Sequence, residues 1–296
     1  MAFRRAVFAA VLVASVCVAG PASASISPYV ESVAEVLPYN GGLALYNYGQ
    51  GGWTVVGATP KQFYMGGPGL FAVDPTTGDI NRYDGTPGQW TTVGGPGAGF
   101  AVGGSRLYGL GPAGNYVAEW NGTGESWTVI GGPAYEIAAG GAGLVASTPG
   151  QTAVYRYNGT SGSWTQIGGS TVGADSLYVN DEGIYAVSDN PTDAVIERWT
   201  GTGQNWTVIG NVGFSNWLWV GGDKVYANSA VTGDTEQYVG TPGNWTDIGQ
   251  PNGEIYAVSQ TTLYALAPDS SYVSKYEPGV GWAKIGGPAE SLAASG

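Results

Sequence analysis

The side chains that most often carry out catalysis are scarce in this 296-residue sequence. It contains no histidine, and its one cysteine is Cys17. The absence of histidine excludes Ser-His-Asp hydrolysis, the common histidine-containing zinc sites and the most frequent general base. We therefore expect no metal and no cofactor, and we look to carboxylates and aromatic rings as the groups that act on a ligand.

A pair of carboxyl groups is the remaining route to catalysis, because a glycosidase needs only two of them, one with a raised pKa. Acidic residues gather in one stretch, at Asp175, Asp181, Glu182, Asp189 and Asp193. Aspartate is common in loops and turns because its side chain bonds the nearby backbone. We interpret these acidic residues as loop and turn residues and expect that the protein is not an enzyme. A glycan-cleaving activity that uses two carboxyl groups stays the third hypothesis.

Tryptophan and tyrosine are the main candidates for ligand binding. The chain has 11 tryptophans and 19 tyrosines, whereas charged residues make up only 11% of it. Neutral sugars present apolar C–H faces that stack on such rings, and neutral polar groups can bind their hydroxyls. The spacing of the aromatic residues indicates which elements present them.

The pattern Trp-Thr-x-Val/Ile-Gly recurs along nearly the whole sequence. Its copies begin at Trp53, Trp90, Trp127, Trp164, Trp206 and Trp245, with a relaxed copy at Trp282. The successive spacings are 37, 37, 37, 42, 39 and 37 residues. Seven copies of one unit are typical of a repeat architecture and leave no room for a second domain.

Each repeat has room for four strands. In the repeat that contains Trp127, glycine, proline and asparagine turns separate four segments rich in β-branched and aromatic residues, at 99–102, 106–110, 115–120 and 126–130. Four strands of about five or six residues with four short turns need about 36 residues. Radial four-stranded sheets form a β-propeller. We therefore predict an all-β fold, a seven-bladed β-propeller of four-stranded antiparallel blades.

The two chain ends are expected to share one blade. The N-terminal segment supplies three strands, at 33–37, 43–48 and 53–56, and lacks the first strand of its blade. Residues 288–294 parallel residues 133–139 and supply the missing strand. A C-terminal strand that joins the N-terminal blade removes the open edge of a linear array.

The N-terminus has the pattern of a secretory signal peptide. Arg4 and Arg5 precede an apolar run over 6–19, and residues 22–24 have the small-x-small pattern of a cleavage site. We predict a cleaved signal over 1–24, a secreted protein and a single propeller domain over 25–296. The apolar run is too short for a membrane span, and the only cysteine leaves with the signal.

The charge after residue 24 is strongly negative. Eight basic and 22 acidic residues leave a formal charge of −14. Such a surface repels nucleic acid and anionic lipid, so we expect neither a nucleic-acid partner nor membrane insertion.

The repeat unit resembles that of a known family. Units such as residues 157–169, Tyr-Asn-Gly-Thr-Ser-Gly-Ser-Trp-Thr-Gln-Ile-Gly-Gly, resemble the repeats of tachylectin-type and tectonin-type propellers. They are also similar to those of seven-bladed bacterial propeller lectins. The resemblance spans all seven repeats and implies carbohydrate recognition, often at several equivalent pockets. No sugar-binding motif of the family matches residue by residue, so it assigns no site here.

Two classes of aromatic residue are candidate stacking positions. One class comprises the repeat tryptophans, Trp53 and its equivalents, and the aromatic residue seven positions earlier, where the candidates are Tyr83, Trp120, Tyr157, Trp199 and Tyr238. Repetition favours packing between blades, but a repeated pocket also makes a multivalent lectin. The other class is Trp217 and Trp219, which alternate along a first strand near the axis and so point the same way. They either plug the central channel or line a single apolar site.

Arginine occupies one repeated position. Arg82, Arg156 and Arg198 each precede a repeat tryptophan by eight residues. Propeller sialidases need several arginines that converge on one carboxylate, whereas this spacing indicates one repeated structural position.

The leading hypothesis is a secreted, lectin-like protein with no catalysis that binds neutral glycans or glycoconjugates weakly at each of several sites. The second is a propeller scaffold for surface proteins, which predicts a large exposed apolar patch on one ring face.

Overall fold

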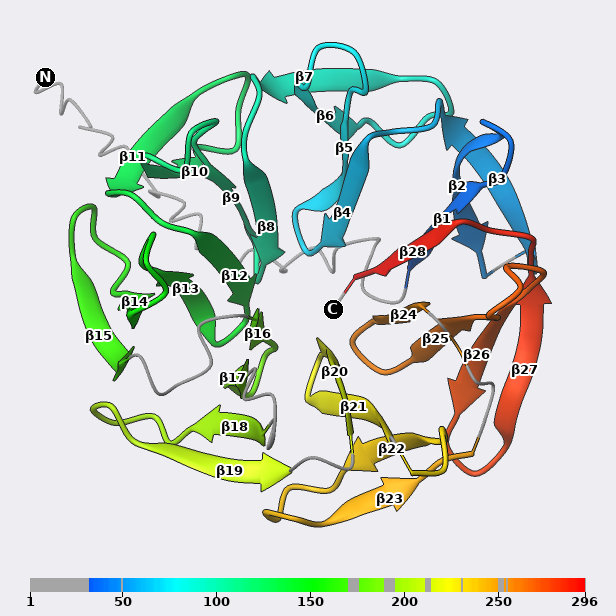
Figure 1. The fold of residues 1–296 in the computed structure, drawn as a ribbon. Coiled ribbons are helices and arrows are strands. Elements are labelled where there is room, and N and C mark those ends of the chain that lie inside the picture. The colour runs from blue at the N-terminus through cyan, green and yellow to red at the C-terminus, as the bar shows by residue number, and fades with distance from the viewer. Residues whose placement is uncertain are drawn as a thin grey trace, which may run out of the picture.

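The protein is a seven-bladed β-propeller, as its sequence predicts. The computed structural model describes residues 32–48, 50–169, 176–188, 195–210, 214–229, 231–249, 253 and 255–295, without the side chains of 214–217. Their 28 strands form seven four-stranded antiparallel sheets. The sheets are arranged as blades around a central axis (Figure 1). No helix that could cross a membrane occurs in the described part of the chain.

The blades are numbered here in chain order, so that blade 1 contains β28 and β1–β3, blade 2 contains β4–β7, and blade 7 contains β24–β27. The inner strands are β28 (Ser291–Ala294), β4 (Gln62–Gly66), β8 (Gly99–Gly103), β12 (Glu136–Gly140), β16 (Ser176–Val179), β20 (Phe214–Gly221) and β24 (Ile255–Val258). The second strands are β1 (Val33–Leu37), β5 (Gly69–Val73), β9 (Arg106–Leu110), β13 (Gly143–Ser147), β17 (Ile184–Ser188), β21 (Lys224–Ser229) and β25 (Leu263–Leu266). The third strands are β2 (Gly42–Asn47), β6 (Ile80–Tyr83), β10 (Val117–Trp120), β14 (Ala153–Tyr157), β18 (Val195–Trp199), β22 (Thr235–Tyr238) and β26 (Val273–Glu277). The outer strands are β3 (Gly52–Gly57), β7 (Trp90–Gly94), β11 (Trp127–Gly131), β15 (Trp164–Gly169), β19 (Trp206–Gly210), β23 (Trp245–Asp247) and β27 (Gly281–Gly286).

The two chain ends close the ring within blade 1. Strand β28 pairs antiparallel with β1, from Val33 opposite Ala294 to Val36 opposite Ser291. Figure 1 shows the red C-terminal strand beside the blue N-terminal one, with the C-terminus near the axis. The predicted shared blade is therefore confirmed. The strand begins three residues later than the parallel segment, because Ala289 donates its N–H to the carbonyl of Ser270 in blade 7 and pairing with β1 begins only beyond it.

The hydrophobic core is divided among the blade junctions. Seven clusters of buried side chains occur among the described residues, one at each of the seven junctions. Blade 4 shows why polar and apolar residues barely alternate along the strands. Leu144 and Ala146 pack toward blade 3, and Val145 packs toward blade 5. Because both faces of a blade are covered, neighbouring residues of a strand are both apolar.

The repeat tryptophans join the blades at the outer rim. Each of the seven indole N–H groups donates to the backbone carbonyl of a valine or isoleucine in the preceding blade, at N–O distances of 2.6 to 3.3 Å. Trp127, for example, donates to Val93, and Trp53 donates to Ile285. The acceptor is the Val/Ile of the Trp-Thr-x-Val/Ile-Gly pattern, so each copy of the pattern contacts the next.

The glycine that follows the acceptor is required by this contact. A Cβ atom at Gly94 would lie 2.6 Å from Nε1 of Trp127, and one at Gly131 would lie 3.0 Å from Nε1 of Trp164. Only glycine leaves room for the indole ring at this distance. The tryptophan, the acceptor and the glycine of the pattern therefore form one inter-blade contact at Gly57, Gly94, Gly131 and Gly286, whereas a Cβ atom at Gly249 would have no neighbour within 4 Å.

Candidate functional site

The two ring faces have different connections. Because neighbouring strands are antiparallel, the turns between inner and second strands and between third and outer strands lie at one face. We call it the hairpin face. The turns between second and third strands and the linkers between blades lie at the opposite face, which we call the linker face. The cavities described below are built from residues of these connections.

Two equivalent cavities lie toward the linker face. The Trp127 pocket, in blade 3, has a volume of about 210 Å³, and the Trp164 pocket, in blade 4, has a volume of about 290 Å³. Eight lining positions correspond at the 37-residue repeat distance: Gly95 and Gly132, Pro96 and Pro133, Gly97 and Ala134, Gly109 and Ala146, Leu110 and Ser147, Gly111 and Thr148, Ala118 and Tyr155, Trp127 and Trp164. The repeat therefore builds the same cavity in two successive blades.

The indole ring in each Trp pocket is held in place by contacts with the rest of the protein. Trp127 is half-buried, donates its N–H to the preceding blade, and packs on Phe100 with ring centres 6.3 Å apart. A tyrosine also lines each pocket, Tyr116 in one and Tyr155 in the other, and both are half-buried. No charged side chain is among the lining residues of either pocket. An aromatic wall with neutral surroundings suits an uncharged ligand with an apolar face.

A larger cavity of a different kind lies at the hairpin face, between blades 4, 5 and 6. It has a volume of about 450 Å³, and we call it the arginine cavity because Arg156 and Arg198 both line it. Trp199, Tyr238 and Glu182 also line it. Its volume is within the range of ordinary small-molecule sites.

The two guanidinium groups are fixed by backbone carbonyls and aromatic rings. Nη2 of Arg156 donates to the carbonyl of Ala142 at 3.1 Å, and its Cζ lies 6.0 Å from the Trp199 ring centre. Nη2 of Arg198 donates to the carbonyl of Glu182 at 2.9 Å, and its Cζ lies 5.8 Å from the Tyr185 ring centre. Burial raises the pKa of the Tyr185 hydroxyl, and the charge of Arg198 opposes that rise.

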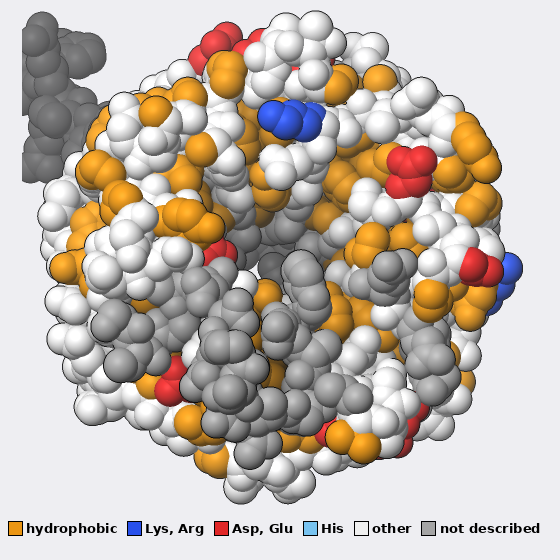
Figure 2. All heavy atoms as spheres, viewed as in Figure 1, with side chains coloured by type: hydrophobic (Ala, Val, Ile, Leu, Met, Phe, Trp, Pro, Cys, Tyr) orange, Lys and Arg blue, Asp and Glu red, His pale blue; other side chains and the backbone are white. Residues whose placement is uncertain are grey.

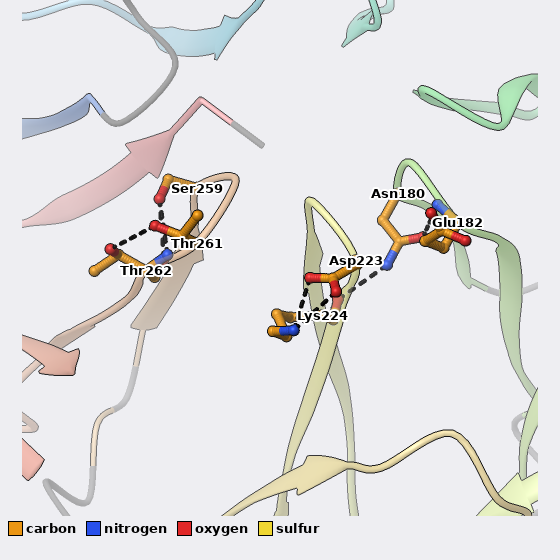
Figure 3. Close-up of polar contacts among 7 residues, drawn as sticks. All are labelled: Asn180, Glu182, Asp223, Lys224, Ser259, Thr261 and Thr262. Carbon is orange, nitrogen blue, oxygen red and sulfur yellow. Dashed lines mark hydrogen bonds and ion pairs between the residues drawn. The ribbon is translucent and has the colours of Figure 1, made fainter. Parts of the chain in front are cut away.

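A buried asparagine builds the turn that holds Arg198. Asn180 is 1% exposed, and its Oδ1 accepts the backbone N–H groups of Glu182 and Gly183 at 2.9 and 2.8 Å. Its Nδ2 donates to the carbonyl of Lys224 in blade 6 at 3.0 Å. Figure 3 shows this bridge between the β16–β17 and β20–β21 turns. The carbonyl that Arg198 contacts is thereby held in place from two blades.

Of the repeated aromatic candidates, two lie at this cavity and three do not. Trp199 and Tyr238 line the arginine cavity, and Trp199 is half-buried. Tyr83, Trp120 and Tyr157 are 5, 8 and 9% exposed and line none of the three cavities described. The rings of Tyr83 and Tyr157 pack on the repeat tryptophans of their own blades. Their use as stacking positions stays a prediction.

The pair of tryptophans near the axis lies on inner strand β20, as predicted. The ring of Trp219 packs on Tyr256 in blade 7, with ring centres 4.3 Å apart, and belongs to the core cluster of that junction. The side chain of Trp217 lies outside the described residues. Trp219 is half-buried and packs against the junction of blades 6 and 7, and its role as a channel plug or a site residue stays a prediction.

The residues of the acidic stretch lie in different environments. Asp175, Asp189 and Asp193 lie outside the described residues. Asp181 accepts the backbone N–H of Gly141 and so joins two inner turns, whereas Glu182 lines the arginine cavity. Among the described residues, no group of three or more metal-ligating side chains is placed to hold an ion.

Sequence reasoning missed the tyrosines and linkers of the Trp pockets. The signal was present, because Gly-Gly-Pro follows the repeat pattern at 94–96 and again at 131–133. Each linker passes over the next blade and forms one wall of its pocket. Tyr116 and Tyr155 do not share a position within the repeat, so neither is a recurring aromatic residue.

Comparison with known proteins supports the fold. No protein-family model and no curated protein matches the sequence. The structure of apo AztD from Citrobacter koseri is similar with a TM-score of 0.57 and 11% identity, over 90% of this chain and 98% of that one. A functionally unknown protein from Desulfotomaculum acetoxidans gives 0.54 and 10%, over 90% and 98%. The GH74 enzyme of Niastella koreensis gives 0.54 and 15%, over 83% of this chain and 41% of that one.

At these identities the likeness shows the fold alone. The class of protein that the fold and the comparisons define is the seven-bladed β-propeller, built in this chain from seven copies of one tryptophan-containing repeat.

Proposed function

We propose that the protein is a secreted, non-catalytic, lectin-like propeller that binds neutral glycans or glycoconjugates weakly at several equivalent sites. The observation that supports this most is the equivalence of the Trp127 and Trp164 pockets, which share eight lining positions at one repeat spacing. Several weak sites on one rigid ring gain strength together when the glycan is itself displayed in many copies.

The chemistry of the Trp pockets supports a neutral ligand. A sugar ring can place its C–H face on an indole whose own N–H is already bonded to the protein, so binding leaves no buried donor unpaired. The hydroxyls of a sugar have tyrosine hydroxyls and the polar backbone of the linkers as partners. Among the described side chains on the face in Figure 2, few are charged, and those few are scattered.

Calorimetric titration with neutral mono- and oligosaccharides at millimolar concentration tests this proposal. Tyr116→Ala should weaken binding at the Trp127 pocket, and Tyr155→Ala at the Trp164 pocket, because each removes an aromatic wall. Tyr39→Ala is the matched control, since this side chain is 95% exposed and lines neither pocket. Absence of saccharide binding, or hydrolysis of the sugar during the titration, would contradict the proposal.

The scaffold hypothesis has less support from the described surface. It predicts one large apolar patch on a ring face, but three of the nine large exposed apolar side chains among the described residues, Val55, Val129 and Val208, lie on the outer strands of blades 1, 3 and 5. These blades are not neighbours, so the three side chains do not join into one patch.

A further inference from the structure

We propose that the arginine cavity is a second binding site, distinct from the Trp pockets, which takes a sugar bearing one carboxylate. This inference goes beyond the proposed function, because it concerns the opposite face of the ring, different residues and a charged ligand. Its starting point is that two positive charges line one cavity of a protein whose net charge is −12.

The two guanidinium groups have no acidic partner within the described residues. The ion pairs there engage Arg106, Lys224 and Lys275, and none includes Arg156 or Arg198. Backbone carbonyls orient a guanidinium but do not neutralise it. Each group has five N–H donors. Arg156 uses two of them, Nε and Nη2, on the carbonyl of Ala142, and Arg198 uses one on the carbonyl of Glu182. The charge and several donors therefore remain for a ligand.

The repeat itself brings the two arginines to one place. Arg156 and Arg198 occupy the same position in blades 4 and 5, and each is followed in the next blade by an aromatic residue of the cavity wall, Trp199 or Tyr238. Arg82 occupies this position in blade 2 and lies over Trp120 in blade 3, with Cζ 5.9 Å from the ring centre. Arg82 does not line the arginine cavity, and of the three cavities described only this one is lined by two arginines.

The other lining groups indicate a sugar acid rather than a multiply charged anion. A guanidinium matches a carboxylate with two parallel hydrogen bonds. Glu182 also lines the cavity, and its carboxylate repels a second negative charge but accepts hydrogen bonds from hydroxyl groups. Thr200, Thr207 and Trp199 add hydroxyl groups and an aromatic surface. A single carboxylate on a hydroxylated ring satisfies all of these groups, as a uronic acid or a sialic acid would.

Calorimetric titration with matched ligands tests the proposal. Glycosides of galacturonic, glucuronic and N-acetylneuraminic acid are each compared with their own methyl ester, which keeps the ring and removes the charge. We expect at least one acid to bind roughly 10- to 100-fold more tightly than its ester, because hydrogen bonds to charged groups are the strong ones. Arg156→Gln and Arg198→Gln should each remove most of that difference, and Arg156→Lys should retain part of it.

Arg82→Gln is the matched control, because it changes the same repeat position away from the cavity. Neutral saccharides, titrated into the same variants, report the Trp pockets separately and should bind unchanged. The proposal is overturned if no acid exceeds its ester, if the difference survives both glutamine variants, or if Arg82→Gln reduces it equally. Inorganic sulfate that binds as tightly as the best sugar acid would also contradict it.

Discussion

Trp53 donates its indole N–H to the backbone carbonyl of Ile285, a residue 232 positions later in the chain, at 3.3 Å. The same bond joins each other pair of neighbouring blades, but here it joins the first blade to the last. The ring is therefore closed twice, at the inner strands by β28 on β1 and at the outer rim by Trp53.

Replacing Trp53 by phenylalanine should destabilise the protein by about 1–3 kcal/mol, because the Ile285 carbonyl loses its donor and the smaller ring leaves a gap. Trp127→Phe makes the same change at an internal junction and should have a similar effect. Thermal unfolding measures both variants. If Trp127→Phe lowers the stability and Trp53→Phe does not, blades 7 and 1 are not joined in solution.

Deleting residues 288–296 should destabilise the whole domain. The deletion removes β28 and the fully buried Ala289, and it leaves the inner edge of β1 without hydrogen-bond partners. We expect a large fall in melting temperature together with aggregation through the exposed edge. Circular dichroism melting and size-exclusion chromatography measure the two effects. An unchanged melting temperature would count against closure through β28.

Gly94→Ala should cost about 1–3 kcal/mol through overpacking, since the added methyl group meets the Trp127 ring and the inter-blade bond must lengthen or break. Gly99→Ala is the control, because a Cβ atom at Gly99 has no neighbour within 4 Å. Chemical denaturation compares the two. Equal stability of both variants would show that the glycine of the repeat pattern is not required by the indole.

Much of the fold could be predicted because the repeat places every strand in a recurring context. The turn residues and the tryptophan pattern located β1, β2 and β3 to within one or two residues, and the likeness of 288–294 to 133–139 located the closing strand to within three. The inter-blade contact could not be predicted in the same way. Its acceptor, such as Val93 for Trp127, lies 34 residues earlier, and a periodic sequence does not show which of its copies touch.

The candidate site was predicted less completely, for a related reason. The spacing of Arg156 and Arg198 in the sequence predicts a structural role, because both precede a repeat tryptophan by eight residues. Whether a charge is paired depends on neighbours in other blades. The burial of a side chain also depends on neighbours in other blades. Trp199 and Trp120 hold equivalent positions in the repeat, but Trp199 is half-buried and Trp120 is 8% exposed.

Glu35 should make the stability of the protein fall as pH rises. Its side chain is 1% exposed on β1, and burial raises the pKa of its carboxyl group from 4.5 to about 8. Between these values the folded state holds a proton that the unfolded state releases. The stabilisation is therefore fully present below about pH 4.5 and is lost progressively up to about pH 8, by about 1.4 kcal/mol per pH unit.

Glu35→Gln removes this titration and should flatten the fall, so that the variant is more stable than the native protein at pH 9. Glu290→Gln, at an exposed position, is the control and should leave the slope unchanged. Denaturant unfolding at pH 5, 7 and 9 measures how the stability of the native protein and of each variant changes with pH. A native slope that persists in Glu35→Gln would show that other groups cause the dependence.

The most direct test of the central claim is a crystal structure of the protein soaked with a neutral oligosaccharide at saturating concentration. We predict a sugar ring against Trp127 and a second against Trp164, in equivalent poses related by the repeat. A saturated crystal with both pockets empty, or with sugar bound only elsewhere on the ring, would contradict the account.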